Sequence, residues 1–126
     1  YEETLDAIKL AMALWKKKMA KPNPETLEKM GGGWVGEEAL AISLYCALSA
    51  EGDFAGGIRL AVNHTGDSDS TGSITGNILG AMLGKAAIPA HWIEELELKE
   101  VIEEMAGDLF VLFGNGDRWR QKYPGF

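Results

Sequence analysis

Apolar residues recur through most of this chain at intervals of three and four, the spacing of an α-helix that buries one face. The first stripe consists of Leu5, Ile8, Met12, Trp15 and Met19. Pro22 and Pro24 follow it, and proline lacks the N–H group that an interior helical position needs. The pattern predicts an opening helix that buries this stripe, and a short second helical turn that starts at Pro24.

The middle of the chain continues in the same way. Residues 36–50 are rich in helix formers, and Glu37 and Glu38 lie at the positive end of the predicted dipole. This composition predicts a largely buried helix. Asp53 is then placed to cap the next helix, whose apolar face contains Phe54, Ile58 and Ala61.

Glycine occupies every fourth position from residue 72 to residue 84. The series is Gly72, Gly76, Gly80 and Gly84, within a helix predicted from Ser70 to Gly84. Each interior glycine costs roughly 1 kcal/mol relative to alanine. We therefore expect neighbouring helices to cross this ridge closely, so that leucine at position 76 or 80 would overpack it.

The last third predicts a short helix around Trp92 and a longer one from Leu98 to Phe113. The longer helix would turn one apolar face inward, formed by Val101, Ile102, Met105, Leu109 and Leu112. Residues 117–126 are expected to be mostly irregular. Since no segment alternates as a strand does, the fold class is predicted to be all-α: a compact orthogonal helical bundle forming a single domain over residues 1–126.

Charge and composition narrow the classes of partner. The net charge of −7 and the pI near 4.8 argue against a nucleic-acid surface, which needs clustered Lys and Arg. No apolar run reaches the ~18 to 20 residues that span a bilayer, so no membrane partner is expected. Cys46 has no second cysteine to pair with and lies on an apolar face, where we expect an inert thiol. With no signal-peptide pattern at the N-terminus, these features favour a cytoplasmic location.

Candidate chemistry gathers in residues 66–72, Gly-Asp-Ser-Asp-Ser-Thr-Gly, where a loop enters a helix. The carboxylates of Asp67 and Asp69 are the oxygen ligands that Mg²⁺, Mn²⁺ and Ca²⁺ prefer. Asp and Ser are equally typical helix caps, so a simple cap is the alternative. An EF-hand is excluded, because the twelfth position counted from Asp67 is Ile78 rather than an acid. His64 could orient a metal-bound carboxylate or could be an ordinary loop histidine.

Two longer stretches are similar to a known family. Residues 33–41, Gly-Trp-Val-Gly-Glu-Glu-Ala-Leu-Ala, and residues 61–72, Ala-Val-Asn-His-Thr-Gly-Asp-Ser-Asp-Ser-Thr-Gly, resemble the ADP-ribosylglycohydrolases of the dinitrogenase-reductase-activating type. The resemblance extends over residues 31–102 and matches the C-terminal half of the family fold. It implies an all-helical protein around two Mg²⁺ or Mn²⁺ ions that hydrolyses the glycosidic bond between ADP-ribose and a protein side chain or small molecule.

Carried over by motif, Asp67, Asp69 and Ser70 would be metal ligands. Asp67 and Asp69 would be the catalytic pair, with Asp69 bridging the ions, while Thr71 stays open as an alternative hydroxyl ligand. The loop 31–34 would line the substrate pocket. ADP-ribose or an ADP-ribosylated molecule is the implied partner.

The chain departs from the family in one respect: it contains no Asp-Asp pair, and so lacks the N-terminal ligand motif. Two acids and a hydroxyl would leave two cations under-neutralised, so we expect weak or absent metal binding by this chain alone. It also starts at Tyr1 rather than Met, and we expect a piece of a longer protein. The missing N-terminal half, or another chain, would complete the enzyme. The alternative is a truncated, non-catalytic helical module that binds ADP-ribose or a protein.

Overall fold

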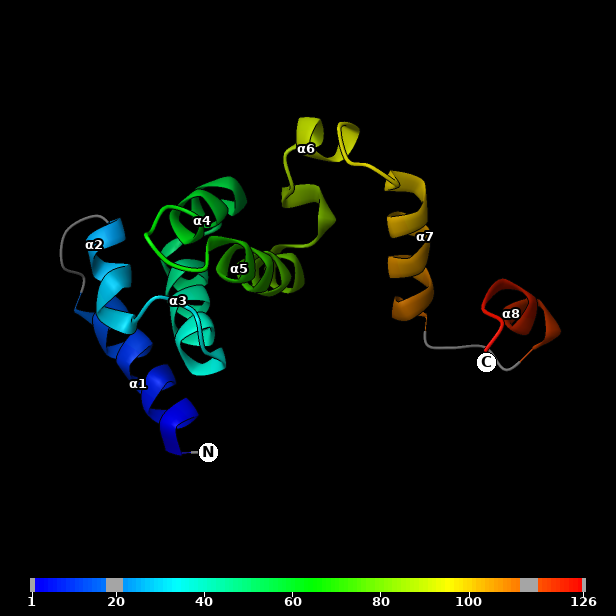
Figure 1. Cartoon of the computed structure of the whole chain (residues 1–126). Helices are drawn as coiled ribbons and strands as arrows, with labels where there is room; N and C mark the ends of the chain where they lie inside the picture. The colour runs from blue at the N-terminus through cyan, green and yellow to red at the C-terminus, as the bar shows by residue number, and fades with distance from the viewer. Residues whose placement is uncertain (1, 18–21, 112–115, 126) are drawn as a thin grey trace. The chain divides into compact units, whose positions relative to one another are not determined.

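The computed structural model describes residues 2–17, 22–111 and 116–125, and the regular structure within them is entirely helical (Figure 1). This confirms the all-α prediction. The chain divides into two compact units, one up to Pro89 and one from Ala90 onward. None of the helices in the described ranges is both long enough and apolar enough to cross a membrane.

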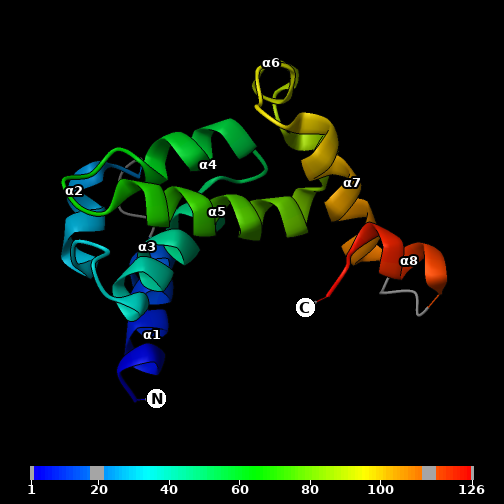
Figure 2. The same ribbon diagram turned by 45° about the vertical axis from the view of Figure 1, so that its right-hand side comes forward.

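The first unit is built around α3 (Gly36–Ser49), which packs against α1 (Glu2–Lys16), α4 (Phe54–Ala61) and α5 (Ser68–Leu83) (Figure 2). Between α1 and α3 lie α2 (Pro24–Leu27) and a 3₁₀ turn (Glu28–Met30), and a second 3₁₀ turn (Lys85–Ala87) follows α5. Half of α3 is buried: Ala39, Ala41, Ile42, Ser43, Tyr45, Cys46 and Ala47. A helix that is apolar on most sides belongs in the centre of a fold, as predicted.

The helix α1 forms where it was predicted, but it buries a different face. Ala7, Ala11 and Leu14 pack on the core, whereas Leu5, Met12 and Trp15 are each about 40% exposed. Small side chains let α1 approach α3 closely, and its larger apolar residues remain outside. The predicted burial of the stripe is therefore wrong at these three residues, and Met19 lies outside the described ranges.

Two helices start where the sequence predicts, at Pro24 and after Asp53, and a side chain caps each of them. The side chain of Asn23 accepts a hydrogen bond from the Thr26 N–H (2.9 Å) at the start of α2, which has Pro24 in its first turn. Asp53 caps α4 by accepting from the Gly56 N–H (2.9 Å). Both caps satisfy N–H groups that have no partner inside their helix.

The helix α5 begins at Ser68, two residues before the predicted start, and buries Thr71, Thr75 and Leu79 at four-residue intervals. The glycine ridge is approached closely at Gly72 but not further along the helix, so the predicted tight crossing is wrong at Gly76 and Gly80. A Cβ atom on Gly72 would stand 2.7 Å from Val62 Cγ1, but one on Gly76 would meet only Ile58, at 3.5 Å, and one on Gly80 would meet nothing within 4 Å. The buried face of α5 is formed by Thr71, Thr75 and Leu79, each of which directly precedes a glycine of the series.

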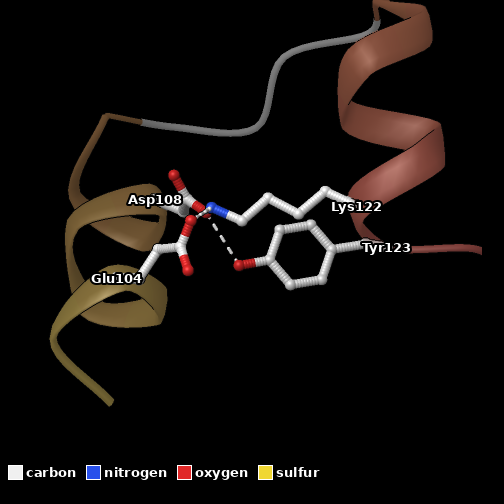
Figure 3. A network of polar contacts seen from close by, with 4 residues as sticks. All are labelled: Glu104, Asp108, Lys122 and Tyr123. Carbon is white, nitrogen blue, oxygen red and sulfur yellow. Dashed lines mark hydrogen bonds and ion pairs between the residues drawn. The ribbon is translucent and has the colours of Figure 1, made fainter. Parts of the chain in front are cut away.

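The second unit holds α6 (Ala90–Glu94), α7 (Lys99–Phe110) and α8 (Asp117–Lys122). The apolar face of α7 was predicted to turn inward, but none of the residues of this helix is buried. The prediction is wrong at Val101, Ile102, Met105 and Leu109, which are exposed. Leu112 lies outside the described ranges. The expectation of an irregular tail is also wrong. The helix α8 forms there and contacts α7 through polar bonds of Lys122 and Tyr123 to Asp108 (Figure 3).

Candidate functional site

The two candidate carboxylates lie together at the start of α5. Asp67 occupies the N-cap position, yet its side chain makes no capping hydrogen bond to the helix. A hydrogen bond with the Asp67 carboxyl group lowers the pKa of Asp69, and the backbone N–H groups of Ser70 and of Asp69 lower it further. Asp69 is exposed, and Asp67 and Ser70 are half-buried. The structure thus brings the two acids side by side at the surface.

Among residues 2–17, 22–111 and 116–125, no cationic side chain forms an ion pair with Asp67 or Asp69. Adjacent carboxylates repel one another when both are ionised, and a divalent cation relieves this repulsion. The described part of the chain nevertheless contains no group of three or more His, Cys, Asp or Glu residues able to hold a metal. Two carboxylates are fewer than such a group requires.

His64 fixes the shape of the loop that carries Asp67. The Gly66 N–H donates to His64 Nδ1 (3.1 Å), so this nitrogen acts as an acceptor and carries no proton. In the neutral ring, Nε2 then bears the hydrogen and donates it to Thr71 Oγ1 at 2.9 Å. His64 therefore binds the loop backbone and Thr71, rather than the acids that it was considered to orient.

Thr71 continues this set of polar contacts into the core. Its side chain is fully buried, and Oγ1 donates to the Ala61 carbonyl (2.8 Å), with the carbonyl oxygens of Asp67 and Ser68 at 3.1 and 3.3 Å. The Thr71 carbonyl in turn accepts from Ser43 Oγ on α3 (3.1 Å). With its hydroxyl engaged and inaccessible, Thr71 is a poor metal ligand, which leaves Ser70 as the hydroxyl candidate.

A second loop, residues 31–34, is held against the acidic loop. The carboxylate of Glu38 accepts from the N–H groups of Gly32 and Gly33, both at 3.1 Å. The Gly32 carbonyl accepts from the Asp67 N–H at 2.8 Å, and a Cβ atom on Gly66 would overlap that same carbonyl group. The contact brings two backbones together and requires glycine at position 66.

Two of these residues carry roles that the sequence pattern did not predict. Glu38 was expected only to complement a helix dipole, and Thr71 only as an alternative ligand. The run of three glycines before Glu38 was the available signal, because such a run leaves several N–H groups that need an acceptor. The loop 31–34 also carries Trp34, whose side chain is 72% exposed.

Comparison with known proteins identifies the family. A sequence profile described as ADP-ribosylglycohydrolase matches residues 1–118, which include all the contacts of the candidate site. The chain belongs to this family. The match to the ADP-ribosylglycohydrolases includes α1, and so extends further than residues 31–102, over which the sequence motifs resemble the family.

Individual relatives are much longer than this chain. An uncharacterized protein of Archaeoglobus fulgidus is 35% identical over 86 residues, which is 68% of this chain and 27% of the relative. The ADP-ribosylarginine hydrolase Tri1 of Serratia proteamaculans is 38% identical over 60 residues, 48% of this chain and 16% of the relative. The ADP-ribosylhydrolase ARH1 of Dictyostelium discoideum is 32% identical over 78 residues, 62% of this chain and 20% of the relative. This ADP-ribosylglycohydrolase chain thus spans about a quarter or less of their lengths, and no solved structure matches it.

Proposed function

We propose that this chain supplies one side of the metal centre of an ADP-ribosyl hydrolase, through Asp67, Asp69 and Ser70. The observation that carries the proposal is the pairing of the Asp67 and Asp69 carboxyl groups at the surface, with Asp67 at an N-cap position that it does not use for capping. A plain cap would direct this side chain toward the helix N–H groups instead. The alternative of a helix cap alone is thereby disfavoured for Asp67, whereas Asp69 also interacts with the backbone N–H groups of the first turn.

The donor set fits Mg²⁺ or Mn²⁺, since hard cations select carboxylate and hydroxyl oxygens. When bound, such ions polarise the bond to be broken and activate a water molecule. Within this chain, Asp67 and Asp69 would hold the ions, with Asp69 shared between them and Ser70 adding a hydroxyl oxygen. The contacts of His64, Thr71 and Glu38 hold the loop in position, and preorganisation of this kind is what catalytic ligands need.

The substrate we propose is an ADP-ribosylated arginine side chain, in which the enzyme breaks the N-glycosidic bond between ribose and guanidinium. Support comes from the relatives of Serratia proteamaculans and Pseudomonas putida, which are 38% and 33% identical and both named ADP-ribosylarginine hydrolase. The dinitrogenase-reductase-activating subtype, which the sequence motifs resemble, belongs to the same proposal. Trp34 and the backbone of residues 31–34 would line the pocket next to the acids.

The test uses Mn²⁺ as the probe, because its paramagnetism broadens NMR signals of nearby residues even when binding is weak. In the whole chain, millimolar Mn²⁺ should broaden the amide signals of residues 64–72 selectively. Asp69→Asn should abolish this local effect while preserving helix capping, since asparagine caps as well as aspartate. Asp53→Asn is the matched control, because Asp53 is also an exposed acid at a helix start but caps α4 in the ordinary way.

Local broadening that is lost in Asp69→Asn and retained in Asp53→Asn supports the metal site. Broadening of the same amides in the Asp69→Asn protein would contradict it. That result would leave Asp67 and Asp69 as structural residues of the loop.

The second candidate is a non-catalytic module that binds ADP-ribose or a protein. Its support is the incomplete ligand set of the described residues, together with the small share of each relative that the chain covers. ADP-ribose binding without any Mn²⁺ effect at residues 64–72 would favour this function over the first.

A further inference from the structure

The glycine run before α3 is folded around a carboxylate of the chain itself. The N–H groups of Gly32 and Gly33 both donate to a single oxygen of Glu38, Oε2, at 3.1 Å each. A Cβ atom on Gly31 would overlap the Glu38 carboxyl group, so only glycine lets the backbone pass this close. Successive N–H groups that converge on one anion form a common anion-binding arrangement. Glu38 thus fixes the path of a segment that glycine alone leaves flexible.

The same segment holds Asp67. Its N–H donates to the Gly32 carbonyl at 2.8 Å, and a Cβ atom on Gly33 would stand 3.7 Å from Asp67 Cβ. The carbonyl of Gly32 and the N–H of Gly33 belong to one planar peptide group, which cannot bend between them. A single rigid unit therefore donates to Glu38 on one side and accepts from Asp67 on the other.

The two candidate acids are held in different ways. The carboxyl group of Asp69 interacts with backbone N–H groups of the first turn of its own helix, as well as with Asp67. The side chain of Asp67 makes no capping bond to α5. The backbone N–H of Asp67 lies ahead of the helix and has no acceptor within it, so its partner is the Gly32 carbonyl. The place of Asp67 beside Asp69 thus depends on a contact outside α5.

We infer that Glu38 is the positioning residue of Asp67: through the peptide group between Gly32 and Gly33, it holds this acid beside Asp69. The inference deepens the proposed function and rests on it wherever Asp67 is treated as a metal ligand. Glu38 has no contact with an ion in this role and acts only through the loop. Loss of a group that orients a ligand in this way typically lowers metal affinity about 10–100-fold.

Three substitutions separate the hydrogen bonds of Glu38 from its charge. Glu38→Ala removes both. Glu38→Gln removes the charge but keeps a carbonyl oxygen, and one oxygen is enough because both N–H groups share Oε2. Glu37→Ala removes the other acid in the first turn of α3, which is also half-buried, and so controls for the loss of charge at this helix start.

The first readout is amide hydrogen exchange of the whole chain without metal, followed by NMR. Glu38→Ala should accelerate exchange of the Asp67 N–H at least about tenfold, because the peptide group that accepts it is no longer held by charge-assisted bonds. Glu38→Gln should recover most of the protection, and Glu37→Ala should retain it. The Tyr45 amide within α3 separates this local opening from global unfolding.

Unchanged exchange of the Asp67 N–H in Glu38→Ala, or equal acceleration in all three variants, would overturn the inference. If Glu38→Ala unfolds, Glu38→Asp takes its place, since a carboxylate one methylene shorter cannot reach both N–H groups.

The second readout is the Mn²⁺ broadening of residues 64–72. Glu38→Ala should raise the Mn²⁺ concentration for half-maximal broadening roughly 10–100-fold, and Glu38→Gln should recover most of the loss. Added to Asp67→Asn, Glu38→Ala should cost little more, because both changes affect the same ligand.

The outcomes distinguish this inference from the proposed function. An equal Mn²⁺ response in wild type and Glu38→Ala overturns the inference and leaves the metal site in place. A response retained in Asp69→Asn contradicts the metal site, while exchange of the Asp67 N–H still shows whether Glu38 positions this residue. In a chain that gives no local Mn²⁺ response, the exchange result alone decides the inference.

Discussion

Two buried threonines on the same face of α5 provide a matched test of what a buried hydroxyl contributes. Thr71 Oγ1 bonds to His64 and to the Ala61 carbonyl, whereas Thr75 Oγ1 is buried without a hydrogen-bond partner. Valine has nearly the shape of threonine, so substitution removes the hydroxyl and little else. We expect Thr71→Val to lower the free energy of unfolding by about 1–3 kcal/mol, because it leaves buried partners unsatisfied.

For the same reason we expect Thr75→Val to be neutral or stabilising, since it removes a polar group that has no partner. Urea denaturation of both variants measures the difference, with the exposed Thr4→Val as the reference for helix propensity. If Thr75→Val destabilised the chain as much as Thr71→Val, the account of both hydroxyls would be wrong.

The thiol of Cys46 should make stability depend on pH. Burial raises its pKa from 9.0 to about 12, so the unfolded chain loses this proton at a lower pH than the folded one. The stabilising contribution is complete below about pH 9 and declines as the pH rises toward 12, by up to about 1.4 kcal/mol per pH unit. The unfolding free energy of wild type relative to Cys46→Ala should therefore fall between about pH 8 and pH 10.5. A difference that stays constant over this range would mean that the thiol is hydrated in the folded state.

Residue-level chemistry at the site was only partly accessible from the sequence. Asp67, Asp69 and Ser70 were proposed as ligands because oxygen donors are concentrated there and resemble a family motif. The roles of Glu38 and His64 were not, because both bind backbone N–H groups of glycines, and such partners follow from the path of the chain rather than from side-chain spacing. Contacts to backbone atoms leave little trace in a residue pattern.

At the scale of helices, glycine substitution distinguishes close crossings from open faces. A Cβ atom on Gly57 of α4 would stand 2.6 Å from Leu79 Cδ1 and 2.9 Å from Ala50 Cβ, whereas one on Gly80 of α5 meets nothing within 4 Å. We expect Gly57→Ala to destabilise the chain, by about 1–3 kcal/mol through overpacking. Gly80→Ala should stabilise it by about 0.5–1 kcal/mol, because alanine restricts the unfolded chain and favours the helix.

Thermal unfolding of the two variants separates these effects by their opposite signs. A lower midpoint for Gly80→Ala would show that something packs on this side of α5. It would then restore the original interpretation of the glycine repeat as a tight crossing.

The positions of the helices were predictable, but their contacts often were not. Pro24 and Asp53 mark the starts of α2 and α4 locally, and a run of helix formers marks α3, so these three helices form where expected. The periodicity of α1 allows either of two adjacent helix faces to be buried. The face with the small residues Ala7 and Ala11 is the one that packs on the core. The helix α8 was missed because its stability depends on non-local bonds of Lys122 and Tyr123 to α7.

The whole chain belongs to an enzyme family but spans about a quarter or less of the lengths of its relatives. We expect the purified chain to release no ADP-ribose from ADP-ribosylated arginine, even with Mg²⁺ or Mn²⁺, since two carboxylates cannot neutralise and position two cations. A chromatographic assay measures the release, with the Serratia proteamaculans hydrolase as the positive control. Metal-dependent release that disappears in Asp69→Asn would contradict this expectation, and would mean that two copies of the chain combine their ligands.

The contact of Gly66 with the Gly32 carbonyl has a consequence for how this protein can change over generations. Any side chain at position 66 overlaps a backbone group, and no substitution at position 32 can make room, because every residue has that carbonyl. The requirement for glycine at position 66 is therefore independent of catalysis. It acts equally on a lineage that keeps Asp67 and Asp69 and on one that has lost them. Selection for folding alone would preserve the shape of this loop long after selection for catalysis had ended. An intact loop therefore shows that a protein descends from this family, but does not by itself show that the protein is active.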